Sequence, residues 1–205
     1  MQPLLIFPFN GNALEAVDCI GDNFNLIGFV DDTLEKQGKT KFGKDVFSRD
    51  ALGKNKEYLV LAVPGSPTSF KIRHEIIAGL KIDEKRFATV IHPKASVSPM
   101  AKVGKNVLIM AGVVITSNAV IEDHVCILPN TVIHHDVVIK KYTLIGSNVS
   151  IAGGTEVGEN CYIGSGTKII NNIKIGDRVL IGLGSNVIKS ITNDSKVAGN
   201  PAREL

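Results

Sequence analysis

The second half of the chain repeats every six residues without a change of register. Ile or Val occupies seventeen successive positions with this spacing: Ile91, Val97, Val103, Ile109, Ile115, Ile121, Ile127, Ile133, Ile139, Ile145, Ile151, Val157, Ile163, Ile169, Ile175, Ile181 and Val187. An α-helix repeats about every 3.6 residues and a strand every second residue, so neither produces a strict period of six. A triangular solenoid does, because each hexapeptide makes one short strand and a corner, and three hexapeptides complete a coil.

The other positions of the hexapeptide fit the same coil. A small or β-branched residue recurs four positions after each aliphatic one, as at Ala95, Val107 and Thr131, and Gly often follows the aliphatic residue directly, as at Gly104. We expect the aliphatic side chains to point inward and the glycines to relieve crowding at the corners. Stacked coils then pair as parallel strands about 4.8 Å apart. The repeat therefore predicts a left-handed parallel β-helix of about five coils.

The first part of the chain has a different pattern. Short apolar strands are expected at residues 4–7, 26–30 and 58–63, and helices at 13–20 and 70–80. Alternating strands and helices predict an α/β unit with a small parallel sheet of the Rossmann-like βαβ kind, and a binding site along the carboxyl ends of its strands. We therefore expect an α/β domain over residues 1–85 and the β-helix domain over residues 86–205.

Composition and charge argue against several classes of function. The net charge is +3, and Lys and Arg are spread along the chain, which disfavours nucleic-acid binding. The apolar runs are too short to cross a membrane and the first residues lack the basic start of a signal peptide, so we expect a cytoplasmic protein. Three widely spaced cysteines, Cys19, Cys126 and Cys161, suit neither a disulfide framework nor a cysteine zinc site. Cys161 occupies a small-residue position of the repeat and is expected to be a buried free thiol.

Two imidazoles and a carboxylate stand together at one point of the repeat, at His134, His135 and Asp136. Transfer of an acyl group from a thioester to an amine or alcohol needs a base whose pKa is near neutrality, and histidine titrates in that range. A neighbouring carboxylate orients the ring and stabilises its protonated form. This point of the repeat is therefore the expected position of a general base.

The hexapeptide run, the segment Val90-Ile91-His92-Pro93 before it and the segment 197–203 after it together resemble the hexapeptide-repeat acyltransferases. With an α/β domain in front, the chain is similar to sugar O- and N-acyltransferases of the sialic acid O-acetyltransferase and bacillosamine-pathway nucleotide-amino-sugar N-acetyltransferase type. The resemblance implies a homotrimer in which acetyl-CoA lies between neighbouring subunits and the N-terminal domain holds a nucleotide-linked sugar. It implies direct transfer of the acetyl group without a metal.

The resemblance also assigns roles to particular residues. The family's base lies two residues after an aliphatic position and just before an acidic residue, which selects His135, with Asp136 as its partner. A glycine N–H one coil further on stabilises the oxyanion in the family, and Gly153 holds that position. The family's acyl-CoA path corresponds to Ser165, Gly182, Gly184 and Lys189, and its nucleotide pocket to Gly11, Asn12, Asp31 and Asp32.

Three positions of the acceptor pocket depart from the family. Asn12 stands where the glycine-rich loop usually has a histidine, Leu128 replaces an asparagine near the base, and Leu144 replaces a histidine on the substrate side. The transfer residues are kept while the acceptor pocket differs. The identity of the sugar, and the choice between an amine and a hydroxyl acceptor, therefore stay open.

Besides acetylation of a nucleotide-activated amino sugar, three other functions are considered. One is O-acetylation of a sugar or a sialic-acid-like compound. Another is a zinc hydratase of the γ-carbonic-anhydrase type, which shares the β-helix but needs three convergent histidines, whereas His124, His134 and His135 are clustered in the sequence. The third is a non-catalytic trimeric scaffold, which would not need His135.

Overall fold

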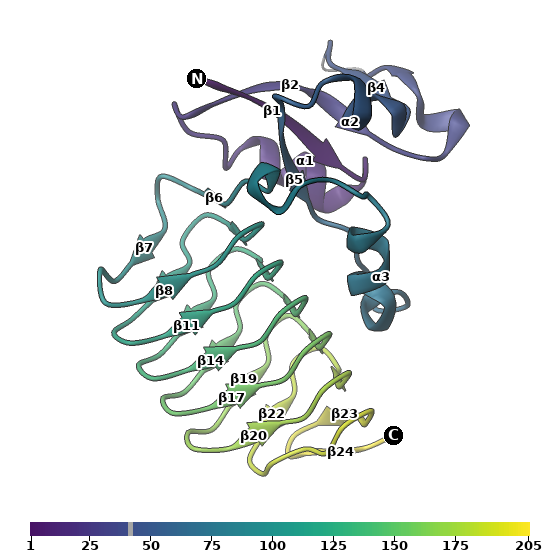
Figure 1. The fold of residues 1–205 in the computed structure, drawn as a ribbon. Helices are drawn as coiled ribbons and strands as arrows, with labels where there is room; N and C mark the ends of the chain where they lie inside the picture. The colour runs from purple at the N-terminus through teal and green to yellow at the C-terminus, as the bar shows by residue number, and fades with distance from the viewer. Residues whose placement is uncertain (41–42) are drawn as a thin grey trace.

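The computed structural model describes residues 1–40 and 43–205 and consists of an α/β part seated on one end of a solenoid (Figure 1). The α/β part contains β1 (Gln2–Phe7), α1 (Gly11–Val17), β2 (Phe24–Val30), η1 (Leu34–Lys36), β3 (Gly38–Lys39), β4 (Asp45–Phe47), α2 (Asp50–Lys54), β5 (Leu59–Ala62), η2 (Phe70–Ile72), α3 (Arg73–Ala78) and η3 (Glu84–Arg86). Its sheet has the order β3-β4-β2-β1-β5. The pairs within β4-β2-β1-β5 are parallel, and β3 pairs with β4 antiparallel.

The strands predicted at 4–7, 26–30 and 58–63 are confirmed as β1, β2 and β5, with ends displaced by at most two residues. The helix predicted to start at residue 13 begins earlier because the Asn10 side chain accepts a hydrogen bond from the Ala13 N–H and caps α1. The helix predicted at 70–80 is divided into a 3-10 turn, η2, and the short helix α3. The sequence pattern does not predict β3, β4 or α2, because segments of two to five residues are too short to show a period.

The solenoid strands lie on three sheets. The first sheet has β6 (Val90–Ile91), β9 (Leu108–Ile109), β12 (Cys126–Ile127), β15 (Leu144–Ile145), β18 (Tyr162–Ile163), β21 (Leu180–Ile181), β23 (Lys196–Gly199) and β24 (Ala202–Glu204). The second has β7 (Ser96–Val97), β10 (Val114–Ile115), β13 (Val132–Ile133), β16 (Ser150–Ile151), β19 (Lys168–Ile169) and β22 (Asn186–Val187). The third has β8 (Lys102–Val103), β11 (Val120–Ile121), β14 (Val138–Ile139), β17 (Glu156–Val157) and β20 (Lys174–Ile175).

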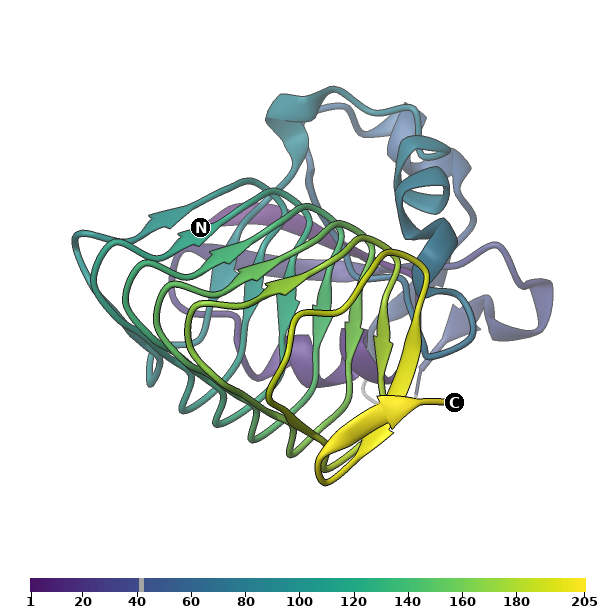
Figure 2. The ribbon, with the colours of Figure 1, turned by 90° about the horizontal axis from the view of Figure 1, so that it is seen from below.

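Neighbouring strands within each sheet pair in parallel over most of the solenoid, with partners eighteen residues apart, as in Ile133 with Ile151. The view along the axis shows the triangular cross-section (Figure 2). The predicted left-handed β-helix is confirmed, and residues eighteen apart form vertical columns along it. The antiparallel hairpin of β23 and β24 closes its far end.

The solenoid core consists of the predicted aliphatic columns. From Ile109 to Val187 these side chains are at most 3% exposed. The first coil has no coil above it, and Ile91 is accordingly 39% exposed. Cys161 is a fully buried free thiol whose pKa is raised by burial to about 12, as predicted for this small-residue position.

The α/β part packs on the outward face of the sheet that contains β9. The outward residues Leu108, Cys126 and Leu144 belong to one buried cluster with Leu4 and Phe29 of the α/β sheet. Elsewhere the face of a solenoid is open to solvent, so this apolar column fixes which sheet the α/β part covers. None of the helices in the described ranges combines the length and hydropathy that a membrane span requires.

Polar contacts fix the junction as well. The Asn106 side chain accepts from the Ala62 N–H at 2.7 Å and donates to the Ala62 carbonyl at 2.8 Å. The Asn106 amide nitrogen also lies 3.0 Å from His124 Nδ1, and the His124 ring is stacked on the Tyr142 ring. The fully buried Arg73 donates from Nε to the Pro64 carbonyl and from Nη1 to the His124 carbonyl. These bonds tie β5 and the loop after it to one corner of the solenoid.

Candidate functional site

His135 and Asp136 lie at the corner between β13 and β14. Asp136 has a left-handed backbone (φ +58°), which Asp and Asn tolerate better than most residues. His135 Nδ1 lies 2.7 Å from Asp136 Oδ2, and both side chains are more than half exposed. An ionised carboxylate can only accept, so in the neutral imidazole Nδ1 carries the proton and Nε2 keeps its lone pair. The ring is thus oriented as a base.

Asn118 is a second partner of this carboxylate. Its amide donates to Asp136 Oδ1 at 3.1 Å from the coil above. The hydrogen bonds from His135 and then from Asn118 lower the pKa of Asp136, which keeps the carboxylate ionised. The residue-by-residue reading of the sequence does not find Asn118. Its signal is the eighteen-residue spacing from Asp136, which places both in one column.

Gly153 lies directly below the imidazole, one coil further along. A methyl group on Gly153 would come within 2.6 Å of both Cε1 and Nε2 of His135. Only a glycine lets the ring approach this backbone. Within the described residues the Gly153 N–H has no hydrogen-bond acceptor, so it is free to bind one. The structure therefore places the His135 imidazole next to a backbone N–H that has no acceptor in the described residues, and their roles as base and oxyanion donor stay predictions.

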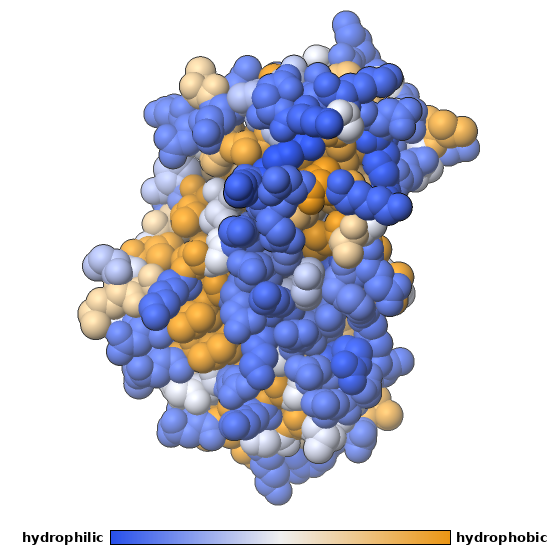
Figure 3. All heavy atoms as spheres, in the orientation of Figure 1, coloured by the Kyte–Doolittle hydropathy of each residue, from blue (hydrophilic) through white to orange (hydrophobic). Residues whose placement is uncertain are grey.

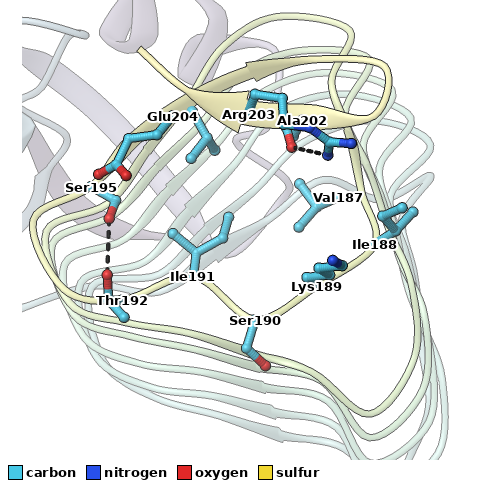
Figure 4. A pocket seen from close by; sticks show the side chains of 11 residues that line it. Val187, Ile188, Lys189, Ser190, Ile191, Thr192, Ser195, Ala202, Arg203 and Glu204 are labelled. Atoms are coloured by element: carbon cyan, nitrogen blue, oxygen red, sulfur yellow. Dashed lines mark hydrogen bonds between the residues drawn. The ribbon is translucent and has the colours of Figure 1, made fainter.

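Lys189 belongs to the same column as His135 and Gly153. Three eighteen-residue steps separate it from His135, which corresponds to about 14 Å along the solenoid. It lines a cavity of about 420 Å³ at the far end, together with Arg203. Figure 4 shows both cationic side chains at this cavity, and Thr192 hydrogen-bonded to Ser195 on its other side. The sequence search did not single out Arg203, because a lone Arg near the end of a chain carries no pattern.

The other predicted acyl-CoA residues lie at a different corner. Ser165, Gly182 and Gly184 follow the strands β18 and β21, whereas His135, Gly153 and Lys189 follow β13, β16 and β22. A single copy of the chain therefore does not bring the two sets together. The eighteen-residue period carries this separation, because Gly153 and Lys189 are whole coils away from His135, whereas Ser165 is not.

Exposed apolar side chains flank both corners. Ile170 and Ile188 are 45% and 49% exposed beside the His135 column, and Leu183 is 72% exposed beside Ser165. Figure 3 shows apolar residues on the left side of the solenoid, the side of the corner that joins β7 to β8. Large exposed apolar residues in line with a candidate site suggest a surface that is covered in an assembly.

The carboxyl ends of β1, β2 and β5 border a cavity of about 560 Å³. Its lining includes all four predicted acceptor residues, Gly11, Asn12, Asp31 and Asp32. Asp31 is buried and accepts hydrogen bonds from the Phe9 and Thr33 N–H groups and from Lys36. Although burial acts to raise it, the pKa of Asp31 is lowered by the Thr33 N–H and by Lys36. Asp31 therefore shapes the loop, while Asp32 is half exposed and pairs with Arg49.

The three departures from the family meet in one place. Asn12, Leu128 and Leu144 line a smaller cavity of about 210 Å³ between the α/β part and the solenoid. His124 and His134 do not join His135: His124 is buried against Tyr142, and His134 is half-buried with no side-chain hydrogen bond in the described ranges. Residues 1–40 and 43–205 contain no group of three or more His, Cys, Asp or Glu side chains arranged to hold a metal ion.

Comparison with known proteins matches both parts of this fold. Residues 100–135, 118–153, 136–171 and 154–189 match the family model described as bacterial transferase hexapeptide (six repeats). No curated protein matches the sequence. A mutant of perosamine N-acetyltransferase from Caulobacter crescentus, solved with CoA and GDP-perosamine, superposes with a TM-score of 0.88 at 22% identity, covering 100% of this chain and 97% of that one.

Two further solved structures cover the whole of this chain. The acetyltransferase domain of PglB from Neisseria gonorrhoeae, solved with acetyl coenzyme A, has a TM-score of 0.85 at 24% identity, with 99% of that domain covered. WeeI from Acinetobacter baumannii has a TM-score of 0.75 at 20% identity, with 100% of it covered. At these identities the likeness shows the fold. Residues 100–189 are thus hexapeptide repeats of the bacterial transferase type, carried on a chain whose entire fold is shared with these three structures.

Proposed function

We propose that this protein is an acetyl-CoA-dependent acetyltransferase that acts on a nucleotide-activated amino sugar. One observation carries the proposal: His135, whose Nδ1 donates a hydrogen bond to Asp136 and leaves Nε2 free, lies against Gly153, whose N–H has no acceptor among the described residues. These are the two groups that direct acyl transfer needs: a base and an oxyanion donor. Similar folds crystallised with CoA and GDP-perosamine, or with acetyl coenzyme A, support the same substrate classes.

The transfer needs no covalent enzyme intermediate. The acceptor amine attacks the thioester carbonyl carbon while His135 Nε2 takes one of its protons, so a C–N bond and a tetrahedral oxyanion form. The Gly153 N–H donates to the oxyanion. When the oxyanion collapses, the C–S bond breaks, and the imidazolium returns its proton to the departing sulfur of CoA. Asp136 stabilises the imidazolium between these two events.

The proposed path of acyl-CoA runs along the column that contains His135, Gly153 and Lys189. In this proposal the phosphates of CoA lie near Lys189 and Arg203, and the pantetheine arm runs up the column to Gly153. The opposite wall of the path comes from the corner with Ser165, Gly182 and Gly184 of a second copy, because one copy carries the two corners on different edges. In a ring of three copies, the His135 corner of each copy faces the Ser165 corner of the next copy, so we propose a homotrimer.

The acceptor occupies the cavity at the carboxyl ends of the α/β strands. A nucleotide fits its volume of about 560 Å³, which lies in the usual range for ligand pockets of roughly 300–1,000 Å³. Asn12, which lines both this cavity and the smaller one beside it, marks the direction in which the sugar extends. Asp32 supplies an exposed carboxylate that can accept hydrogen bonds from a base or ribose.

The test is release of CoA from acetyl-CoA in the presence of UDP-, GDP-, CMP- and dTDP-linked 4-amino sugars, followed with a thiol reagent. His135→Ala should lower the rate by about a hundredfold or more. His134→Ala, the adjacent imidazole, is the matched control and should keep most of the rate. If the acceptor group is a sugar hydroxyl, CoA should also be released with otherwise identical sugars that carry a hydroxyl in place of the amine. Absence of release with every acceptor would overturn the proposed activity, and light scattering at a monomer mass would overturn the trimer.

A further inference from the structure

A cavity of about 430 Å³ lies on the face of the α/β sheet that is turned away from the solenoid. Leu52 of α2 lines it and packs with Leu5 and Val60, whereas Leu4, which points to the opposite face, belongs to the cluster that contacts the solenoid. Figure 1 shows α2 at the end of the molecule opposite the C-terminal coils. The lining shares no residue with the acceptor cavity, so this is a separate site.

Basic side chains dominate the lining of this cavity, which we call the basic cavity. Its cationic residues come from separate segments of the α/β part, and the fold gathers them: Arg49, Lys56, Lys81, Lys85 and Arg86. Within the described chain, Asp83 is the one acidic residue that lines it. Like charges held close together repel each other, and a bound anion removes this repulsion. The composition of the lining therefore favours an anionic ligand.

The two arginines of the basic cavity are already engaged inside the protein. Arg86 donates from Nε, Nη1 and Nη2 to three backbone carbonyls of α2 and the loop after it, at 2.8–3.0 Å. Burial lowers the pKa of Arg86, and the carboxylates of Glu57 and Asp83 oppose this shift. Arg49 forms a bidentate pair with Asp32. The planar guanidinium groups, which suit carboxylates, are thus largely used, and the free charges come from the lysines.

Lys56, Lys81 and Lys85 are these free charges. All three are exposed, and none of their ammonium groups forms an ion pair or a hydrogen bond with another described residue. Asp83 can offset only one of the three charges, and its Oδ1 already accepts a hydrogen bond from the Lys85 backbone N–H at 2.9 Å. A lysine ammonium acts as a point charge with three donors and has no planar fork. Several such groups around one space suit a phosphate, whose oxygens carry more than one charge and point in several directions.

We infer that the basic cavity binds a phosphate-bearing ligand through Lys56, Lys81 and Lys85. The volume of the cavity lies in the roughly 300–1,000 Å³ range of pockets that hold a whole ligand. Leu52 and Leu80, which are 2% and 5% exposed, give it an apolar floor on which the rest of such a ligand can pack. This site is independent of the proposed acetyl transfer, because neither the His135 column nor the acceptor cavity contributes to it.

The test measures binding to the full chain without acetyl-CoA or a sugar nucleotide. Inorganic pyrophosphate is titrated by calorimetry at low ionic strength, and vesicles of phosphatidylcholine with phosphatidic acid are tested by co-sedimentation. We expect saturable binding of pyrophosphate that weakens as salt is added. Binding to the vesicles alone would still support the inference and would identify the phosphate as that of a lipid head group. Absence of binding to both probes would overturn it.

Variants of equal charge locate the binding. Replacing all three lysines of the basic cavity by glutamine should weaken it at least about tenfold, because each exposed charge contributes about threefold. The matched control replaces three exposed lysines outside the cavity by glutamine, and it should bind within about threefold of the unaltered chain: Lys39, Lys94 and Lys105. All six side chains are exposed, so both proteins should fold and melt as the unaltered chain does.

Two results with these variants would overturn the inference. One is an equal loss of affinity in the two triple variants, which would show that only the net charge of the protein matters. The other is binding that Lys189→Gln abolishes and the three substitutions in the basic cavity leave unchanged. In that case the probe occupies the cavity at the far end of the solenoid.

Discussion

Replacing Gly153 by alanine isolates the contact on which the proposed chemistry depends. The new methyl group would lie 2.6 Å from Cε1 and Nε2 of His135, while ordinary contacts begin at 3.4 Å, so the ring must move by at least 0.8 Å. The ring can do so because the His135 side chain is 66% exposed. Gly153 is not in the left-handed region, so alanine can adopt its backbone conformation. The fold should therefore tolerate the substitution, with an effect on the free energy of unfolding within about 0.5 kcal/mol.

Catalysis should not tolerate it. Displacement of a reacting group by about 1 Å can cost about a hundredfold in rate, which corresponds to about 2.7 kcal/mol of transition-state stabilisation. We expect kcat/KM for CoA release to fall by about this factor while the melting temperature stays unchanged. Gly53→Ala is the control, because a methyl group there meets nothing within 4 Å. A Gly153→Ala protein that retained kcat/KM within about threefold would refute the placement of thioester and base around this glycine.

Four other expectations follow from the described contacts. Asp136→Asn should lower kcat at least about tenfold without changing the melting temperature, and Asn118→Ala should lower it less, because the Asn118 amide reaches the base only through the carboxylate. Lys189→Ala should raise KM for acetyl-CoA several-fold, an increase that shrinks at high salt; a salt-independent increase would argue against a phosphate contact. Arg73→Met should lower the free energy of unfolding in urea by about 2 kcal/mol or more, since two buried carbonyls lose their donor. The pKa of His124 is lowered to about 4 by burial and then by Arg73. As the pH falls, the unfolded chain is protonated at this residue before the folded protein is, so the melting temperature should fall between about pH 6.5 and 4. His124→Gln should flatten this slope.

Sequence periodicity accounts for the solenoid but only partly for its surroundings. The Ile and Val columns dictate the β-helix because any slip of register would expose them. A period of eighteen carries further information. The outward residues of one sheet are uninterruptedly apolar or aromatic at Leu108, Cys126, Leu144 and Tyr162, whereas the equivalent positions of the third sheet include Lys102, Glu156 and Lys174. That contrast predicts which face the α/β part covers. It does not predict Arg73, because a basic residue in a short amphipathic helix is more often solvated than buried.

Some parts of the candidate site can likewise be predicted from the sequence, and others cannot. His135, Asp136 and Gly153 can be found because the repeat fixes their relative heights, and so could Asn118 once columns replace the linear sequence. The small cavity cannot be found this way, because it depends on how the loop around Gly65 meets Leu144. Loop conformation has no period. The placement of side chains along the columns can therefore be predicted from this sequence, whereas the lining of the cavities at the junction requires the structure.

The position of the carboxylate illustrates why fold and chemistry coincide at this corner. The column that contains Asp136 has left-handed backbone in four successive coils, at Asn118, Asp136, Gly154 and Asn172. Apart from glycine, Asn and Asp adopt this conformation most readily, so the corner selects Asn, Asp or Gly for reasons of folding alone. Among these three, only Asp supplies a charge, and it does so directly after the residue whose ring faces the next coil. An alanine at Asp136 would confound strain with lost charge, whereas asparagine keeps the turn, so the rate of Asp136→Asn measures the contribution of the charge.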